Sequence, residues 1–230
     1  MQRVCVSIGS ASLDDALAAV DRAAPLADVV EIRLDHLSVP VVSPFMTAVQ
    51  RPLLFTNRPE WEGGGYCGPE EERIAPLCEA LCQGASYVDL ELLAPLESRQ
   101  VLLREVEKSA QGRLILSWHQ FQGTPSFQEL VGRMALMQDA GADIGKIVTT
   151  AHGPADVRSV LRLLEEAARL NFPLIAFCMG RAGVISRVAS VELGGYMTYC
   201  AAHETEITAP GQLSVTTLRR IESLMGGEQP

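Results

Sequence analysis

Several features that mark large classes of protein are scarce or absent in this sequence. Lysine and arginine number 19 against 28 aspartates and glutamates, so the formal net charge of the 230 residues is −9. An acidic chain of this kind is unsuited to non-specific nucleic-acid binding. The chain also lacks an apolar run of the roughly 20 residues that span a bilayer, and its N-terminus lacks the apolar run of a signal peptide. We therefore expect neither nucleic acid nor a membrane among its partners.

Cysteine patterns that bind metals or build disulfide frameworks are missing as well. The six cysteines are scattered, without a Cys-x-x-Cys pair and without a histidine at zinc-finger spacing. We interpret them as reduced thiols, which persist in the reducing cytoplasm. The sequence therefore predicts a cytoplasmic protein with no metal site.

What the chain does contain is a regular alternation of apolar, β-branched runs with helical patterns. Eight runs are typical of strands: 3–9, 27–35, 51–58, 86–92, 112–120, 142–150, 172–180 and 195–202. Each is followed by a helical pattern: 12–24, 43–50, 69–84, 96–110, 126–141, 154–171, 181–194 and 214–225. Such alternation indicates parallel strands joined by helical crossovers.

Eight strand–helix units within about 250 residues are typical of one closed barrel. We predict the α/β class, with a single (β/α)8 TIM barrel as one domain over residues 1–230. An open doubly wound sheet is the structural alternative. It usually shows a glycine-rich turn after the first strand, and "SIGSASLDD" is a poor match to that turn.

Charged residues occur late in several predicted strands, where the active site of such a barrel lies. In the second strand, Glu31, Arg33 and Asp35 share one face by the period of two. In the fourth, Asp89 and Glu91 do the same. Both faces of a parallel barrel strand are normally apolar, so these charges indicate function.

Lys146 lies inside an apolar strand, and burying an unpaired ammonium costs several kcal/mol. Near arginines such as Arg58, the ammonium form is disfavoured, and a neutral amine attacks carbonyls to form a Schiff base. His119, at a strand end, is able to move protons at neutral pH. Arginines at the barrel mouth, including Arg187, are suited to binding a carboxylate. The combination indicates a small keto acid as substrate.

Seven segments then resemble one known family in the family's own order, from residue 31 to about 215. They are "EIRLDHL", "FTNRPEWEGG", "YVDLEL", "SWHQFQGTPS", "ADIGKIVTTAH", "FCMGRAGVISRV" and "TAPGQLSV". The lysine in A-D-x-x-K-I, the pattern S-x-H-x-F-x-x-T-P and the closing A-P-G-Q are the most specific. The chain resembles the type I 3-dehydroquinate dehydratases, the Schiff-base enzymes of the shikimate pathway.

The resemblance implies a role for each matching residue. Lys146 would form an imine with the C3 ketone of 3-dehydroquinate, and His119 would remove the C2 proton and then protonate the departing C1 hydroxyl. Glu62 would orient or polarise His119. The remaining matches would bind or enclose the substrate: Glu31, Arg33, Arg58, Met179, Arg187, Thr208 and Gln212. The family analogy also implies a homodimer and no cofactor, since the lysine itself activates the ketone.

Two positions depart from the family pattern. Gln120 follows the histidine where aspartate is frequent, and Thr208 replaces a serine on the loop that would close the site. Two other functions stay open. Another Schiff-base barrel lyase, of the class I aldolase kind, would share the lysine without needing His119, Arg187 and A-P-G-Q together. A non-catalytic sensor of a cyclic hydroxy acid should have lost Lys146 or His119, and the chain keeps both.

Overall fold

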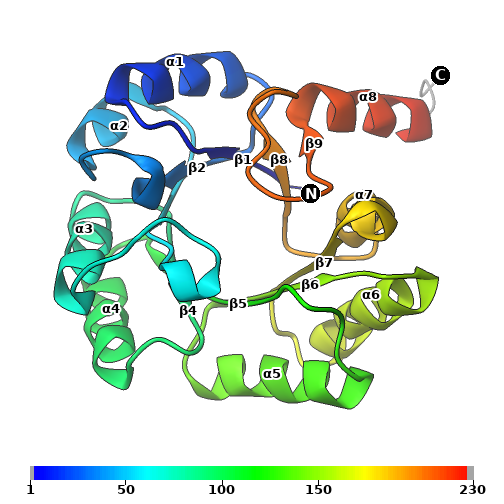
Figure 1. Ribbon diagram of the computed structural model, residues 1–230. Coiled ribbons are helices and arrows are strands. Elements are labelled where there is room, and N and C mark those ends of the chain that lie inside the picture. The colour runs from blue at the N-terminus through cyan, green and yellow to red at the C-terminus, as the bar shows by residue number, and fades with distance from the viewer. Residues whose placement is uncertain (1–2, 227–230) are drawn as a thin grey trace.

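The computed structural model describes residues 3–226. Its strands surround the centre of the molecule, and the helices form a ring outside the strands (Figure 1). The two ends of the predicted domain, 1–2 and 227–230, lie outside the described residues. The strands are β1 Val4–Ile8, β2 Val29–Arg33, β3 Leu53–Thr56, β4 Tyr87–Glu91, β5 Arg113–Gln120, β6 Ile144–Thr150, β7 Leu174–Met179, β8 Thr198–Ala201 and β9 Leu213–Ser214.

A helix follows each of the eight predicted strands. The helices are α1 Leu13–Ala23, α2 Ser43–Ala48, α3 Glu70–Cys82, α4 Leu96–Lys108, α5 Phe127–Asp139, α6 Pro154–Arg169, α7 Val184–Glu192 and α8 Val215–Gly226. Three short 3-10 helices, η1 Leu34–His36, η2 Glu60–Glu62 and η3 Arg181–Gly183, follow β2, β3 and β7. The predicted (β/α)8 barrel is therefore confirmed, and the open doubly wound sheet is wrong.

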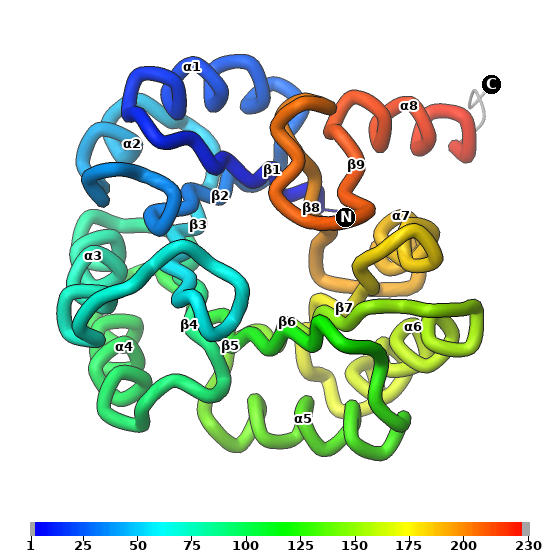
Figure 2. The backbone as a smooth tube through the Cα atoms, in the orientation of Figure 1, coloured from blue at the N-terminus to red at the C-terminus, as the bar shows by residue number. Residues whose placement is uncertain are grey.

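All strand pairs are parallel, in the order β7-β6-β5-β4-β3-β2-β1-β8-β9. The two-residue strand β9 was not predicted, because so short a segment shows no periodicity. The segment between β8 and β9, orange in Figure 2, lies beside the end of β1. Within residues 3–226 no ladder joins β7 to β8, and only the bond from Tyr196 N to Leu174 O (2.8 Å) bridges the start of this seam.

The period of two divides the strand residues between two cores. Residues that face outward pack under the helices, while a smaller cluster fills the barrel interior, including Cys5, Val29, Leu54, Ile115 and Ile144. Two residues further along these strands the interior turns polar, with Ser7, Glu31, Thr56, Asp89, Ser117 and Lys146. An apolar floor thus supports a polar layer toward the carboxyl ends of the strands, where a barrel places its site.

One expectation about strand β2 is wrong. Asp35 does not share the strand face of Glu31 and Arg33, because the strand ends at Arg33 and Asp35 lies in η1. The apolar Leu34, which is fully buried, begins that turn. Asp35 still reaches Arg33, but across the turn and not along the strand.

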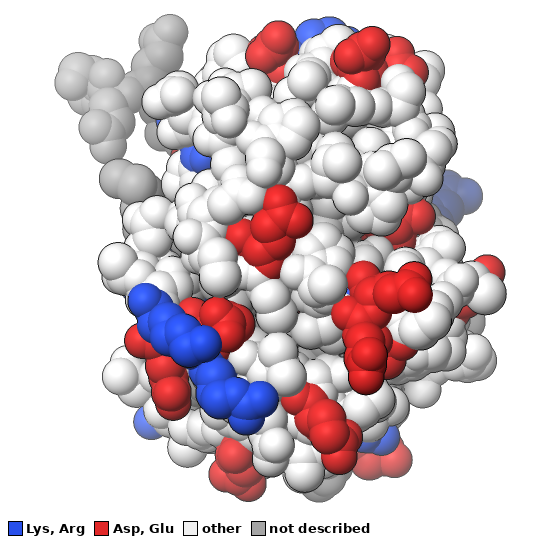
Figure 3. Space-filling model, turned by 90° about the vertical axis from the view of Figure 1, so that its left-hand side faces the viewer, with Lys and Arg blue, Asp and Glu red and all other residues white. Residues whose placement is uncertain are grey.

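The acidic balance of the sequence is visible on the outer surface. Figure 3 views the left-hand side of Figure 1, where α3 and α4 lie, and shows acidic side chains scattered over an otherwise mostly uncharged face. Helix α3 begins with Glu70, Glu71 and Glu72, which suits the positive end of a helix dipole. The positive charges of interest are those buried inside the barrel.

The helix layer supplies a direct test of this packing. Leu102 on α4 is fully buried, whereas Leu96 on the same helix is half exposed. We expect Leu102→Ala to lower the free energy of unfolding by ~2–5 kcal/mol, because it leaves a cavity in the core. Leu96→Ala is the matched control and should cost less than about 1 kcal/mol. Urea denaturation measures both, and equal losses would contradict the assigned orientation of α4.

Candidate active site

A cavity of about 270 Å³ opens at the carboxyl ends of the strands. All ten residues that the sequence proposed for the site line it: Glu31, Arg33, Arg58, Glu62, His119, Lys146, Met179, Arg187, Thr208 and Gln212. They come from five strands or the turns after them, from α7 and from the segment before β9. The barrel therefore brings together residues that lie up to 181 positions apart in the sequence (212 − 31 = 181).

Lys146 points into the barrel from β6 and is only 4% exposed. Its Nζ lies 3.0 Å from Asp89 Oδ2 and 4.2 Å from the centroid of the Tyr199 ring. This carboxylate partner of Lys146 was not predicted from the sequence. Asp89 projects inward from β4, two strands away, and gives the buried Nζ a carboxylate partner.

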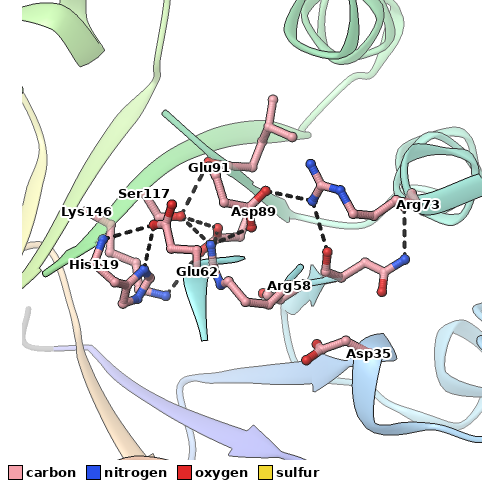
Figure 4. A network of polar contacts seen from close by, with 12 residues as sticks. Asp35, Arg58, Glu62, Arg73, Asp89, Glu91, Ser117, His119 and Lys146 are labelled. Carbon is pink, nitrogen blue, oxygen red and sulfur yellow. Dashed lines mark hydrogen bonds and ion pairs between the residues drawn. The ribbon is translucent and has the colours of Figure 1, made fainter. Parts of the chain in front are cut away.

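Asp89 is the centre of a buried network (Figure 4). Its Oδ1 accepts from Arg58 Nη2 at 2.8 Å and from Ser117 Oγ at 2.6 Å. Arg58 Nη1 also donates to Glu91 Oε1 and to Ser117 Oγ, both at 2.6 Å. Burial alone would raise the pKa of Asp89, but Arg58 and Lys146 outweigh it and hold that pKa below its ordinary value. Asp89 is therefore an anion at neutral pH.

His119 and Glu62 form a second buried pair. One oxygen, Glu62 Oε1, lies 2.9 Å from His119 Nδ1 and accepts from the backbone N–H of His119 at 2.9 Å. Burial, followed by the positive charges of Arg58 and Lys146, lowers the pKa of His119 well below its ordinary value. A neutral imidazole that donates from Nδ1 to Glu62 keeps Nε2 unprotonated, so Nε2 is able to accept a proton.

Glu62 is itself reluctant to ionise. Burial raises its pKa to about 8, and the nearby Glu91 and Asp89 add to that rise while Arg58 opposes it. The carboxyl group thus holds a proton at neutral pH, and the histidine next to it gains no full negative charge to stabilise an imidazolium. Glu62 and the neutral ring of His119 therefore each hold one proton in the resting site.

The side of the cavity near β2 is held by carboxylates. Glu31 accepts from Ser7 Oγ at 2.5 Å and from Thr56 Oγ1 at 2.8 Å, so both neighbouring strands orient it. Asp35 forms a two-pronged pair with Arg33, at 2.9 and 2.6 Å. Its Oδ2 also accepts from Gly65 N at 3.0 Å. Asp35 therefore ties Arg33 to the loop that carries Glu62.

Arg187 reaches the cavity from α7, beside the seam between β7 and β8, and is 2% exposed. Its Nε has no hydrogen-bond partner among residues 3–226, and Nη2 has one long bond, 3.4 Å, to Pro210 O. Burial lowers its pKa to about 10, so it stays charged at neutral pH. A buried cation without a carboxylate partner is suited to a small anion.

The segment before β9 covers one side of the opening. Thr208 donates to Gln212 Oε1 from both its backbone N (2.9 Å) and its hydroxyl (3.0 Å). Gly180 N, just after β7, donates to Pro210 O at 3.2 Å. Gly211 has φ +74°, and a Cβ there would lie 2.7 Å from Gly180 O, so this close approach requires glycine. Met179, at the end of β7, lines the cavity below the segment.

Several contributors to the site could not be predicted from the sequence. Asp89 and Glu91 were recognised as charges on one face, but only the barrel shows that they pair with Lys146 and Arg58. Ser7, Thr56 and Ser117 gave no signal, since serine and threonine are common in strand ends. Among residues 3–226, no cluster of three or more potential ligands is arranged to hold a metal ion. No helix in that range is long and apolar enough to span a membrane.

The fold and the cavity together define a class: (β/α)8 barrels with a lysine and a histidine at the floor and mouth of one polar site. A family model described as type I 3-dehydroquinase matches residues 4–229, so the chain belongs to that family. The chain is 50% identical, over 220 residues and 96% of both chains, to a 3-dehydroquinate dehydratase of Desulfotalea psychrophila. The predicted family, one of hydro-lyases, is confirmed.

Solved structures agree. The 3-dehydroquinate dehydratase of Geobacillus kaustophilus superposes with a TM-score of 0.89 at 28% identity, covering 100% of this chain and 93% of that one. The type I enzyme of Clostridium difficile, solved with covalently modified comenic acid, gives 0.87 at 27% identity, covering 97% and 92%. Both structures share the whole barrel.

The electrostatics of His119 lead to a measurable expectation. A free histidine takes up a proton near pH 6.5, but the lowered pKa of His119 keeps its ring neutral as the pH falls through that value. Nitrogen NMR of ring-labelled histidine should show one neutral ring at pH 6 that is absent from His119→Asn. Protonation of this ring at or above pH 6.5 would contradict the assigned environment.

Proposed function

We propose that this protein is a 3-dehydroquinate dehydratase of the shikimate pathway, which converts 3-dehydroquinate to 3-dehydroshikimate through a Schiff base on Lys146. The observation that carries the proposal is the convergence of Lys146, His119 and the unpaired Arg187 on one cavity. Family membership adds support, since the curated relative carries this activity in its name.

In the proposed reaction the Lys146 ammonium gives up a proton and its Nζ attacks the C3 ketone. The ketone oxygen leaves as water, and the iminium that forms takes over the positive charge of the former ammonium. Asp89, 3.0 Å from Nζ, then faces the iminium as it faced the ammonium. The site keeps its charge balance between the two states, so little reorganisation is required.

His119 is suited to both proton transfers. Its neutral Nε2 takes the C2 proton, which the iminium acidifies, and an enamine results. The imidazolium then donates that proton to the C1 hydroxyl, which leaves as water and regenerates the neutral ring. Hydrolysis of the product imine consumes one water and frees Lys146. Glu62 orients the ring through Nδ1 throughout.

We assign the substrate contacts according to how many protein partners each charged side chain already has. Arg187 would bind the carboxylate, while Glu31 and Arg33 would bind hydroxyl groups. Arg58 already serves Asp89, Glu91 and Ser117, so we assign it at most one substrate contact through a remaining N–H. Met179, Thr208 and Gln212 would enclose the ring, with the segment before β9 closing over it. Thr208 supplies the hydroxyl of the serine that it replaces.

The alternatives are less well supported. A class I aldolase-like lyase would share the lysine, but it does not need a histidine whose Nε2 stays free beside an unpaired arginine. A non-catalytic sensor has no use for the paired Lys146 and the neutral His119. We further propose that residues 1–230 act as one catalytic domain, without a cofactor, as a cytoplasmic homodimer. Sedimentation at micromolar concentration tests the dimer.

Chemical trapping tests the Schiff base. The chain has two lysines, Lys146 and the exposed Lys108, which pairs with Glu105. Borohydride added with 3-dehydroquinate should attach a ligand-derived mass to Lys146 and leave Lys108 unmodified, as read by peptide mass spectrometry. Lys146→Met should show neither adduct nor turnover. Turnover by the native protein without any adduct would rule out the imine mechanism.

Removing the imidazole separates imine formation from elimination. We expect His119→Ala to lower kcat by about 10²–10⁴-fold, the usual contribution of a positioned acid–base group, while the borohydride adduct at Lys146 still forms. The exposed His152 provides a control, and His152→Ala should keep most of the activity. Near-normal turnover in His119→Ala would show that another group carries the proton.

A further inference from the structure

Arg73 on α3 is the largest fully buried side chain of the described protein, with 1% exposure, although it comes from the helix layer. Its Nη1 donates to Glu91 Oε2 at 2.6 Å and to the backbone oxygen of Asn57 at 3.0 Å. Its Nε and Nη2 each donate to Glu70, both at 2.8 Å. The guanidinium thus spans from the outer surface of α3 to the ends of β3 and β4.

These contacts extend the network of Lys146 to the protein surface. Figure 4 shows Arg73 at one end of the network and Lys146 at the other. The charges alternate strictly along it: Lys146, Asp89, Arg58, Glu91, Arg73 and Glu70. Every contact in the series is 3.0 Å or shorter. Only Glu70, at the outer end, has a partly exposed side chain, and Ser98 Oγ holds it at 2.7 Å.

Glu91 is the residue whose charge and position depend on Arg73. Its carboxylate bridges two arginines, one oxygen to each, and both cations are needed to offset its complete burial. Asp89 on the same strand adds negative charge nearby, whereas Glu62 on η2 holds its proton at neutral pH, and β5 contributes the neutral Ser117. Burial already raises the pKa of Glu91, and Arg58 and Arg73 oppose that rise.

We propose that Arg73 is a positioning residue for the reaction at Lys146: it keeps Glu91 ionised and in place, and Glu91 in turn holds Arg58 against Asp89. Arg73 does not line the cavity, so it acts through these three residues and not on the substrate. The inference rests on the proposed dehydratase function, because its test uses the turnover of 3-dehydroquinate.

Without the guanidinium, Glu91 loses one of its two cations, so its pKa rises further. Glu91 then takes up a proton within the working pH range. A neutral Glu91 binds the Nη1 end of Arg58 less strongly, so Arg58 is free to move away from the position in which its Nη2 meets Asp89. Turnover should therefore fall on the acid side of the pH profile and recover toward higher pH.

The experiment compares pH profiles of kcat for the native protein and Arg73→Gln, which removes the charge but keeps an N–H donor. We expect the acid limb of the variant to lie about 1–3 pH units higher, with KM changed less than kcat. Arg73→Lys, which keeps the charge, should bring the limb back toward its native position. An unchanged limb in a folded Arg73→Gln, or the same shift in both variants, would overturn the proposal.

Two backgrounds separate positioning from simple structural support. In Glu91→Gln the group that titrates is gone, so the limb should be the same with Arg or Gln at position 73. Glu70→Gln leaves the charge of Arg73 in place and should not move the limb. A loss of thermal stability without a shifted limb would assign Arg73 to structure alone. If Arg73→Gln does not fold, Arg73→Met, which keeps the length of the side chain, replaces it in the same comparison.

The native protein decides which proposal has failed. If it does not turn over 3-dehydroquinate and forms no borohydride adduct, the proposed function is wrong. If it does both and the limb is insensitive to residue 73, the function stands and the role of Arg73 is wrong.

Discussion

The ion pair between Lys146 and Asp89 in the middle of the barrel is the constraint on which the rest of the site depends. A buried ammonium is tolerated only with a close counter-charge, and a buried carboxylate needs more than one donor. Asp89 therefore also accepts hydrogen bonds from Arg58 and Ser117. The buried Arg58 in turn pairs with Glu91. The second oxygen of Glu91 accepts from Arg73 of the helix layer. Alternation of sign along this series is what permits so many charges to be buried together.

The two groups to which we assign proton transfers, Lys146 and His119, have carboxyl partners in opposite charge states. Lys146 pairs with Asp89, whose carboxylate is ionised at neutral pH. His119 is hydrogen-bonded to Glu62, whose carboxyl group holds its own proton. Arg58 contributes to both outcomes, since its charge lowers the pKa of Asp89 and also that of His119. The site thus holds a lysine paired with a carboxylate and a neutral histidine in one cavity.

The remaining positive charge of the site, Arg187, lies beside the part of the described sheet that lacks a hydrogen-bond ladder. No ladder joins β7 to β8 within residues 3–226, and Arg187 of α7 enters the cavity beside that seam with its Nε unpaired. The segment before β9 is tied to Gly180 at the same place. Arg187 and the covering segment are therefore neighbours, and the carboxylate that we propose for Arg187 would lie beside that segment.

The sequence by itself determined the barrel, because eight apolar runs with helical patterns between them fit few other arrangements. It also determined the ten cavity residues, since charges late in parallel strands must converge at one end and the matching segments kept the family's order. Only the tertiary structure shows which charged side chains pair with each other. Asp89 reaches Lys146 across two strands, Arg73 reaches Glu91 from a helix, and Asp35 leaves its strand at a turn. Such pairings depend on the register and tilt of the strands, which periodicity does not encode, so the charge state of Lys146 could not be read from its neighbours in the chain.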